Sequence, residues 1–128
     1  MAAPLHLDPL LRGLEAPFCA TFYPLGFPME IETNDRRVLE CAGSSFGIFR
    51  RPESAAAPLR LRLVRVDQAT AAPPWPPPVH RGWGDLLAVL CGPENFLAAD
   101  LARNQVMGFF STAMLDDREF FRWTFLEC

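Results

Sequence analysis

The sequence predicts an α+β fold: one mixed, mostly antiparallel sheet of about five to six strands, with two main helices at about 35–46 and 113–126. Several short segments alternate apolar and polar residues with period two, as strands do. Two further segments carry apolar residues at helical spacing behind capping residues. The chain has 128 residues, the length of one domain, so 1–128 is predicted to be a single domain.

The first strand signal is the segment "TFYPLGFPMEIET", which alternates with period two. The residues expected on its apolar face are Tyr23, Leu25, Phe27, Met29 and Ile31. Pro24 and Pro28 each remove a backbone donor, which suits an edge strand or a chain bent at Gly26 into two short strands. We favour the bent hairpin.

A helix is predicted next, over residues 35–46. Asn34 is a good N-cap, and Asp35 would lie where the helix dipole favours a negative charge. Gly47 follows as a stop signal. The apolar stripe at helical spacing is formed by Val38, Leu39, Ala42, Ser45 and Phe46.

The middle of the chain combines a strand with a proline-rich stretch. In "LRLRLVRV" (59–66) leucines alternate with arginines until Val64, where a bulge or the strand end is expected. Residues 67–84 hold five prolines and two tryptophans, so we predict an extended surface loop there. The run "PPWPPP" could be a polyproline ligand, but a connector whose Trp75 folds back on the domain is favoured.

Two further strand signals precede the last helix. The run "LLAVLC" (86–91) is apolar throughout, which predicts a central strand covered on both faces. The segments "NFLAADL" and "QVMGFFS" flank "ARNQ", and this pattern predicts a hairpin in which Asn104 takes a positive φ.

The closing helix is predicted over roughly 113–126, with Ser111 or Thr112 as its N-cap. Its apolar residues are spread almost all the way round, and a helix of that kind is buried on every side. We therefore expect the part from Trp123 onward to contact a second domain or chain. The predicted interface residues are Phe121, Trp123, Phe125 and Leu126.

Composition excludes several classes of function. The net charge of −3 gives no basic surface for nucleic acid or an anionic membrane. No segment approaches the roughly 18 consecutive apolar residues of a membrane span, and the N-terminus is unlike a signal peptide, so a cytoplasmic protein is expected. All twelve basic residues are Arg, which excludes chemistry that needs a lysine amine.

The cysteines and histidines predict neither a metal site nor a cofactor site. Four cysteines are present without a CxxC pair, and each has apolar neighbours: Cys19, Cys41, Cys91 and Cys128. Buried, reduced thiols are therefore expected. His6 and His80 have no second ligand at metal-binding spacing.

Three groups of residues are candidates for a site. Glu30 and Glu32 share a strand face and could form an acid/base pair, although the solvent face of an edge strand explains them more simply. An anion could be held by Arg60, Arg62 and Arg65. A pocket between the sheet and the 67–84 loop, which would bind an anion or metabolite, would be lined by Trp75, Arg81 and Trp83.

Four stretches together resemble the N-terminal accessory module of bacterial HPr kinase/phosphorylase-related proteins: "FYPLGFPMEIETND", "VLECAGSSFG", "ENFLAADLARNQVMGF" and "LDDREFFRWTFLEC". In those relatives the module leads through an "RxxFLE"-like helix into a kinase-like domain with a P-loop. The residues at the matching positions are Arg122, Phe125, Leu126 and Glu127. The chain has no P-loop motif, so no catalytic residue of the family is carried over.

The resemblance implies a non-catalytic accessory or regulatory domain rather than an enzyme. Its partner would be a P-loop kinase-like protein, another chain or a second copy of itself. The alternative function is the binding of a small anion or metabolite in the pocket described above. An enzyme that uses Glu30, Glu32 or Asp100 ranks last, because no catalytic motif accompanies these carboxylates.

Overall fold

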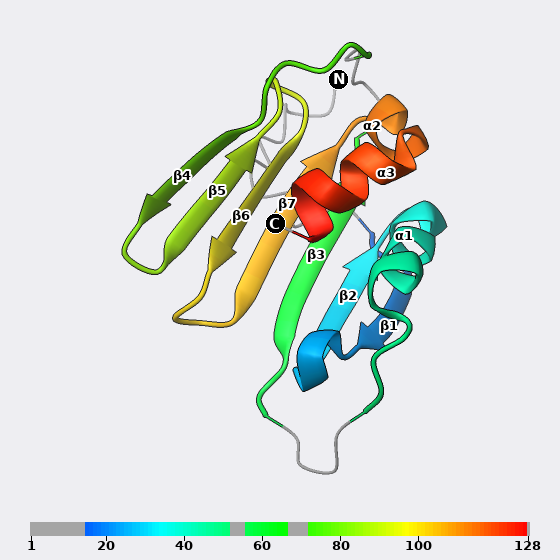
Figure 1. Ribbon diagram of the computed structural model, residues 1–128, viewed down its shortest axis with the longest axis vertical. Helices are drawn as coiled ribbons and strands as arrows, with labels where there is room; N and C mark the ends of the chain where they lie inside the picture. Colours follow the sequence, from blue (N-terminus) through cyan, green and yellow to red (C-terminus); the bar gives the residue numbers. More distant parts are fainter. Residues whose placement is uncertain (1–14, 52–55, 67–71, 128) are drawn as a thin grey trace, which may run out of the picture.

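The computed structural model describes residues 15–51, 56–66 and 72–127, and its strands form one mixed sheet (Figure 1). The strand order is β1-β2-β3-β7-β6-β5-β4. The strands are β1 (Phe18–Phe22), β2 (Met29–Thr33), β3 (Leu59–Arg65), β4 (Val79–Trp83), β5 (Leu86–Leu90), β6 (Phe96–Asp100) and β7 (Gln105–Phe110). The pairs β2–β3 and β3–β7 are parallel, and the other four are antiparallel.

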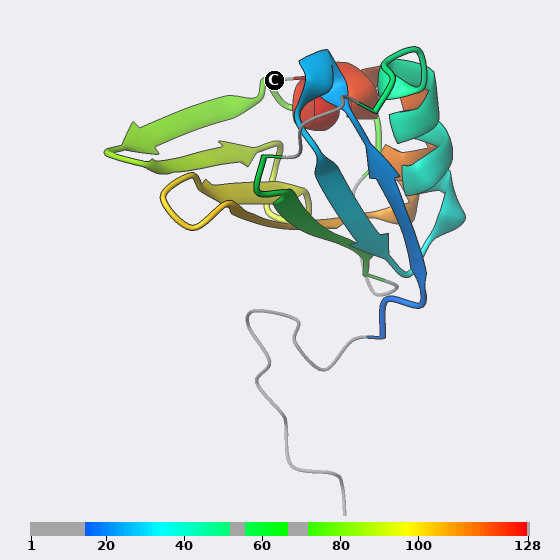
Figure 2. The same cartoon turned by 90° about the horizontal axis from the view of Figure 1, so that it is seen from below.

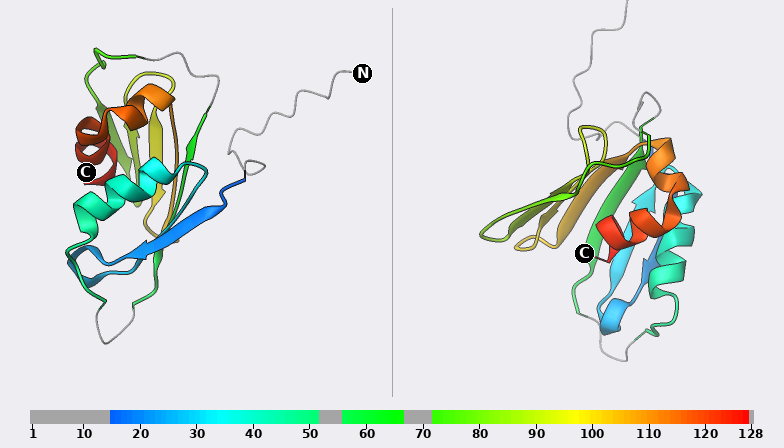
Figure 3. Two further views of the ribbon diagram at one scale, coloured as in Figure 1. Left: turned by 90° about the vertical axis from the view of Figure 1, so that its right-hand side faces the viewer. Right: turned by 45° about the horizontal axis from the view of Figure 1, so that its top comes forward.

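All the main helices lie on one face of the sheet (Figure 2). They are α1 (Arg36–Phe46), α2 (Thr112–Asp116), α3 (Arg118–Phe121) and the π-helical turn η2 (Arg122–Leu126); a short turn, η1 (Pro24–Gly26), joins β1 to β2. They cover the β1–β3 and β7 part of the sheet, whereas the β4–β5 hairpin projects beyond them (Figure 3). Within the described ranges, no helix has the length and apolar character needed to cross a bilayer.

The predicted α+β class and the mostly antiparallel sheet are confirmed, but the sheet has seven strands rather than five to six. The missing strand is β4, which lies inside the stretch 67–84 that we predicted to be a loop. Its sequence, VHRGW, does not alternate apolar and polar residues, and all five residues are exposed. It forms because a two-residue turn, with Gly84 at φ +59°, pairs it with β5 as a hairpin.

The predicted bend at Gly26 is confirmed, and β1 and β2 form an antiparallel hairpin around it. Met29 and Ile31 are buried as expected. Leu25 and Phe27 are exposed, which corrects their predicted place on the apolar face. They lie in the turn, where strand alternation no longer applies.

The N-cap of α1 is Asp35 rather than Asn34. An Asp35 carboxylate oxygen accepts a hydrogen bond from the Arg37 backbone N–H at 2.9 Å. The Asn34 side chain instead donates to the Arg65 carbonyl at 3.0 Å and accepts from the Arg65 N–H at 2.6 Å. It therefore fastens the end of β2 to the end of β3. Gly47 ends the helix without a positive φ.

Of the two alternatives expected at Val64, the strand end is right within one residue, because β3 ends at Arg65. No bulge occurs, since β3 keeps a regular register past Val64, which is buried on the face opposite Leu63. The prediction for β5 needs correction. β5 is not covered on both faces, because it lies next to the edge strand and beyond the helices; Leu86 and Leu87 are exposed. The β6–β7 hairpin is confirmed, and so is the positive φ of Asn104, at 52°.

The closing segment is capped by Ser111 as predicted, but it is not one helix over 113–126. The Ser111 hydroxyl accepts from the Met114 N–H at 3.2 Å. Asp117 then leaves the helical region, with φ −86° and ψ 71°, and separates α2 from α3. Its carboxylate accepts a hydrogen bond from the Trp75 indole at 2.9 Å, which ties the break to the proline-rich connector.

An aromatic cluster in the core holds the closing segment on the sheet. The ring of Phe110 in β7 meets Phe121 and Phe125 edge-on, at centroid distances of 4.9 and 4.8 Å. All three residues are buried. The Phe110 ring needs the space above Gly108, where an added Cβ would lie 2.9 Å from a ring carbon and 2.9 Å from the Phe96 carbonyl oxygen.

We expect Gly108→Ala to lower the free energy of unfolding by about 1–3 kcal/mol, because the new methyl group overpacks this cluster. Urea denaturation would measure the change. Gly43→Ala in α1 is the matched control, since the added Cβ would meet only a ring carbon of Phe22, at 4.0 Å. Its free energy of unfolding should rise by up to about 1 kcal/mol. Equal effects of the two substitutions would contradict the packing argument.

We expect the stabilisation by Asp35 to depend on pH. Burial opposes its ionisation, but hydrogen bonds from Arg37 and the charges of Arg37 and Arg65 outweigh burial and lower the pKa of the carboxyl below 3.8. A lowered folded-state pKa contributes stability above the unfolded-state pKa, and this contribution is lost as pH falls through the folded-state pKa.

Asn at position 35 can still cap the helix, but it loses the charge interactions with Arg37 and Arg65. Asp35→Asn should therefore cost about 1–2 kcal/mol of unfolding free energy at neutral pH, and the difference from the native chain should shrink below about pH 3.8. Urea denaturation across pH measures it. Asp85→Asn, at an exposed turn, is the control and should leave the pH dependence unchanged. A difference that grows toward acid pH would contradict the assignment.

Candidate functional site

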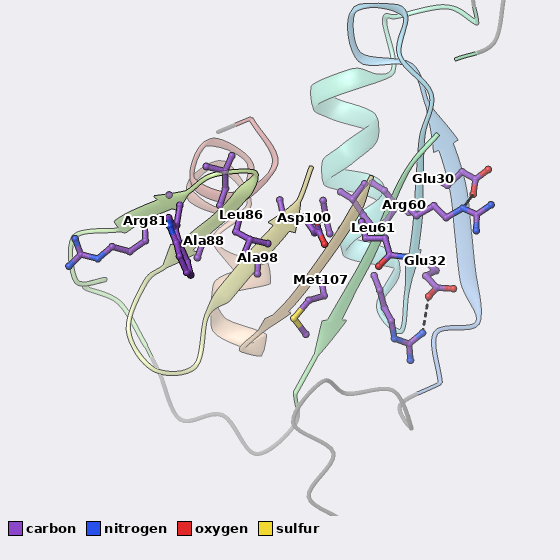
Figure 4. A pocket seen from close by; sticks show the side chains of 18 of the residues that line it. Glu30, Glu32, Arg60, Leu61, Arg81, Leu86, Ala88, Ala98, Asp100 and Met107 are labelled. Carbon is purple, nitrogen blue, oxygen red and sulfur yellow. Dashed lines mark hydrogen bonds and ion pairs between the residues drawn. The ribbon is translucent and has the colours of Figure 1, made fainter. Parts of the chain in front are cut away.

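The face of the sheet that the helices leave open carries a groove of about 1130 Å³. The strand registers align its side chains in two rows across the sheet. One row contains Arg81, Ala88, Ala98, Met107, Arg62 and Glu32. The next contains Trp83, Leu86, Asp100, Gln105, Arg60 and Glu30. Figure 4 shows the labelled residues of β4–β6 on one side, those of β2 and β3 on the other, and Met107 between them.

The half of the groove formed by β4, β5 and β6 is largely apolar, with Arg81 and Asp100 as its charged residues. Ala88 and Ala98 are neighbours in the first row, and their small side chains leave a hollow beside Met107. Trp83 is 85% exposed and Leu86 is 50% exposed. Large apolar side chains beside a hollow of this kind offer contact area to an apolar group of another molecule.

The half formed by β2 and β3 is charged, and its charges neutralise one another. The parallel register places Glu30 beside Arg60 and Glu32 beside Arg62. The Glu30 carboxylate lies 3.6 Å from the Arg60 guanidinium. The Glu32 carboxylate lies 2.9 Å from the Arg62 guanidinium. The two glutamates proposed as an acid/base pair are thus each engaged by an arginine, as the solvent-face interpretation predicts.

The other carboxylate considered for catalysis, Asp100, forms an ion pair with Arg103 at 2.9 Å. It lines the groove but lies on β6, on the apolar side.

The three arginines proposed to hold an anion do not converge. Arg60 and Arg62 line the groove, whereas Arg65 approaches the N-cap of α1, where its guanidinium lies 3.0 Å from an Asp35 oxygen. Asp35 also binds Arg37 at 2.7 Å. Arg65 therefore belongs to the cluster that fixes α1 to the strand ends.

The residues predicted to bind a small molecule lie on two sides of the sheet. Arg81 and Trp83 line the groove on the open face. Trp75 packs against the core on the helix face, stacks on Phe120 at a centroid distance of 6.1 Å and donates to Asp117. The connector whose Trp75 folds back on the domain is thus confirmed, and the pocket between the sheet and the 67–84 loop is not formed by these three residues together.

Of the four predicted interface residues, three lie in the core or pack against it and one is exposed. Phe121 and Phe125 are buried within the chain's own core, and Leu126 packs against it. Only Trp123 is largely exposed, at 62%. The closing segment that carries Trp123 lies on the helix face of the sheet (Figure 1), whereas the groove is lined by side chains of the opposite face.

Two residues of the "RxxFLE"-like stretch fasten the closing segment to α1. The Arg122 guanidinium donates to the Ser45 hydroxyl at 2.8 Å, and this hydroxyl donates to the Glu127 carboxylate at 2.6 Å. Arg122 and Glu127 also form an ion pair at 3.3 Å. Both residues therefore have a structural role within this chain.

The described thiols are reduced and do not gather with other metal ligands. Burial raises the pKa of the Cys41 and Cys91 thiols, so both remain protonated at neutral pH. Cys19 lines the groove and is exposed, which corrects its predicted burial: it lies on an edge strand, β1. Across residues 15–51, 56–66 and 72–127, no three His, Cys, Asp or Glu side chains form a metal-binding group. Cys128 and His6 lie outside the described residues.

Sequence reasoning missed the apolar half of the groove. Leu86, Ala88 and Ala98 of this half were outside our candidate set, and so was Met107 of β7 beside it. We interpreted the apolar run 86–91 as buried on both faces. The stretch "GWGD" before it carries the missed signal, because Gly84 and Asp85 form the Gly-X pair of a two-residue hairpin turn.

Comparison of the chain with family models, curated proteins and solved structures finds no match. The resemblance to the HPr-kinase-related module therefore stays a prediction from the residues quoted above, and the site is interpreted from its own geometry.

Proposed function

We propose that this chain is a non-catalytic, protein-binding domain whose docking surface is the groove on the open face of the sheet. The occupant is a segment of another polypeptide. It inserts an apolar side chain over Ala88 and Ala98 and places polar groups of both charges against the β2–β3 half. The observation that carries this proposal is the exposure of Trp83 and Leu86 beside that hollow.

The distribution of polar groups supports a protein partner. Protein interfaces combine apolar contact area, in which Trp is enriched, with adjoining polar and solvent-accessible groups. Here the adjoining polar groups are the Glu30–Arg60 and Glu32–Arg62 pairs. Because each pair is already neutral, it favours a partner of mixed charge over a strongly charged one.

The resemblance suggests which partner to test first. In the relatives, the accessory module is joined to a P-loop kinase-like domain, so a kinase-like protein is the first candidate. Such a domain would position or regulate its partner by contact and would itself need no catalytic residue.

Binding of a small anion or metabolite remains the alternative function, because Arg81 and Trp83 both line the groove. Two features weigh against it. The groove is larger than the roughly 300–1,000 Å³ of common small-molecule sites. The guanidinium of Arg81 also points away from the other labelled residues (Figure 4).

The groove proposal predicts that Ala88→Arg blocks binding, because the long charged side chain would fill the hollow. Isothermal titration with a purified kinase-like domain of an HPr-kinase-related protein should give a Kd at least about tenfold higher for this variant than for the native chain.

Ala57→Arg makes the same chemical change at an exposed position outside the groove and should bind like the native chain. Thermal unfolding of both variants checks that each is folded. The proposal fails for this partner if the native chain does not bind, or if a folded Ala88→Arg variant binds normally. Stabilisation by metabolites with no protein binding would favour the alternative.

A further inference from the structure

Strand β4 is an edge strand with few of the features that usually protect such edges. It is the last strand of the sheet and pairs only with β5. All five residues are exposed, and the strand contains neither a proline nor a bulge. Proteins commonly protect exposed edges with short strands, charged side chains, prolines, bulges or covering segments. Of these features β4 has its short length and one charged side chain, Arg81. Figure 1 shows β4 as the outermost strand, on the side of the sheet away from α1.

The registers determine which backbone groups of β4 face outward. The Cys91 N–H donates to the Asn95 carbonyl at 2.9 Å, so Cys91, Val89 and Leu87 direct their backbone polar groups toward β6. The intervening residues of β5 direct theirs toward β4, where they meet Val79, Arg81 and Trp83. The outward N–H and C=O groups of β4 therefore belong to His80 and Gly82.

The side chains around Gly82 suit a second strand. Gly82 has no side chain, and glycine in a strand often marks a close approach by another backbone. Arg81 and Trp83 flank it on the open face, and both are exposed. Arg81 directs its guanidinium away from the groove (Figure 4). None of the ion pairs in the described part of the chain involves Arg81.

Two symmetric antiparallel registers centred on this stretch have different consequences. A pairing centred on Arg81 places the two Arg81 side chains directly opposite each other, and like charges in that position are unfavourable. A pairing centred on Gly82 places Arg81 of each copy opposite Trp83 of the other. These are non-hydrogen-bonded positions, where side chains come closest, and Arg over Trp is a favourable cation–π pair.

We propose that two copies of this chain associate through antiparallel β4 strands, with Gly82 opposite Gly82 and Arg81 opposite Trp83 on both sides of the two-fold axis. The outward N–H and C=O of Gly82 bond to their counterparts in the second copy, and the two sheets become one continuous sheet. This inference does not rest on the proposed function, because it concerns the sheet edge rather than the occupant of the groove.

The second copy is favoured over a foreign strand because the edge is self-complementary. A single register satisfies the outward groups of Gly82 and both Arg81–Trp83 pairs with the chain's own residues. One strand pair covers less area than a standard protein interface, so the dimer should be weak and should dissociate on dilution. A foreign acidic strand that pairs with Arg81 is the competing outcome.

The first test uses Gly82→Pro, which removes the outward N–H while keeping the β5 hydrogen bonds. Gly82→Ala is the matched control, because it adds the same Cβ, 3.2 Å from a Leu87 methyl carbon, but keeps the N–H. Sedimentation equilibrium should show a monomer–dimer equilibrium for the native chain and for Gly82→Ala. The dimer Kd of Gly82→Pro should rise at least about tenfold, since two symmetric hydrogen bonds are lost.

The second test determines the register between the two β4 strands by disulfide formation. All chains in this test also carry Cys19→Ser and Cys128→Ser. Chains carrying Arg81→Cys are mixed with chains carrying Trp83→Cys under oxidising conditions. The mixed pair retains one Arg81–Trp83 contact and brings the new thiols to directly opposite positions. We expect a mixed disulfide dimer and little Arg81→Cys homodimer, whose thiols would be diagonal and too far apart.

Three results would overturn the inference. They are a native chain that stays monomeric at its highest soluble concentration, a folded Gly82→Pro variant that dimerises like the native chain, and an Arg81→Cys homodimer as the main cross-linked product. A monomer that binds an acidic peptide along β4 would replace the second copy with a foreign strand. A monomer that still binds a kinase-like domain through Ala88 would leave the groove proposal standing, so the two failures are distinguishable.

Discussion

The ring of Phe110, lying over Gly108 and held edge-on against Phe121 and Phe125, is the contact on which the rest of this structure depends. It joins the central strand β7 to the closing segment and so decides where α3 and η2 rest. Ion pairs then join α1 to the closing segment: Arg37 of α1 binds Asp116 of α2, and Arg118 of α3 binds Glu40 of α1. A side chain at Gly108 would displace the ring and loosen this arrangement.

The helices cover only part of one face of the sheet. They cover β1–β3 and β7 on one face, so the β4–β5 hairpin extends without a helical layer (Figure 3). On the helix face Leu87 therefore remains exposed, although leucine usually lies in a core, whereas Val89 of the same strand is buried. The same hairpin supplies the apolar half of the groove and the unprotected edge strand. Both proposed binding surfaces therefore include residues of this hairpin.

The local parts of the fold were accessible from the sequence, since turns and caps are read from a few adjacent residues. The bend at Gly26, the Asn104 turn and the Ser111 cap are examples. The sequence predicted the burial of individual residues less well. The run 86–91 has the composition of a strand covered on both faces, but whether it is covered depends on the segments that lie next to it in the folded chain. The same reason separates Phe121 and Phe125, which are internal, from Trp123, which is exposed.

The sequence by itself determined the α+β class, most of the strands, the ends of α1 within one residue and the opposite charges along β2 and β3. These features follow from periodicity and local hydrogen bonding, which act over a few residues. Only the tertiary structure decided that Glu30 pairs with Arg60, whereas Arg65 pairs with Asp35. It also decided that Trp75 and Trp83 lie on opposite sides of the sheet. Strand order sets those contacts, and strand order depends on which apolar surfaces meet between segments far apart in the chain.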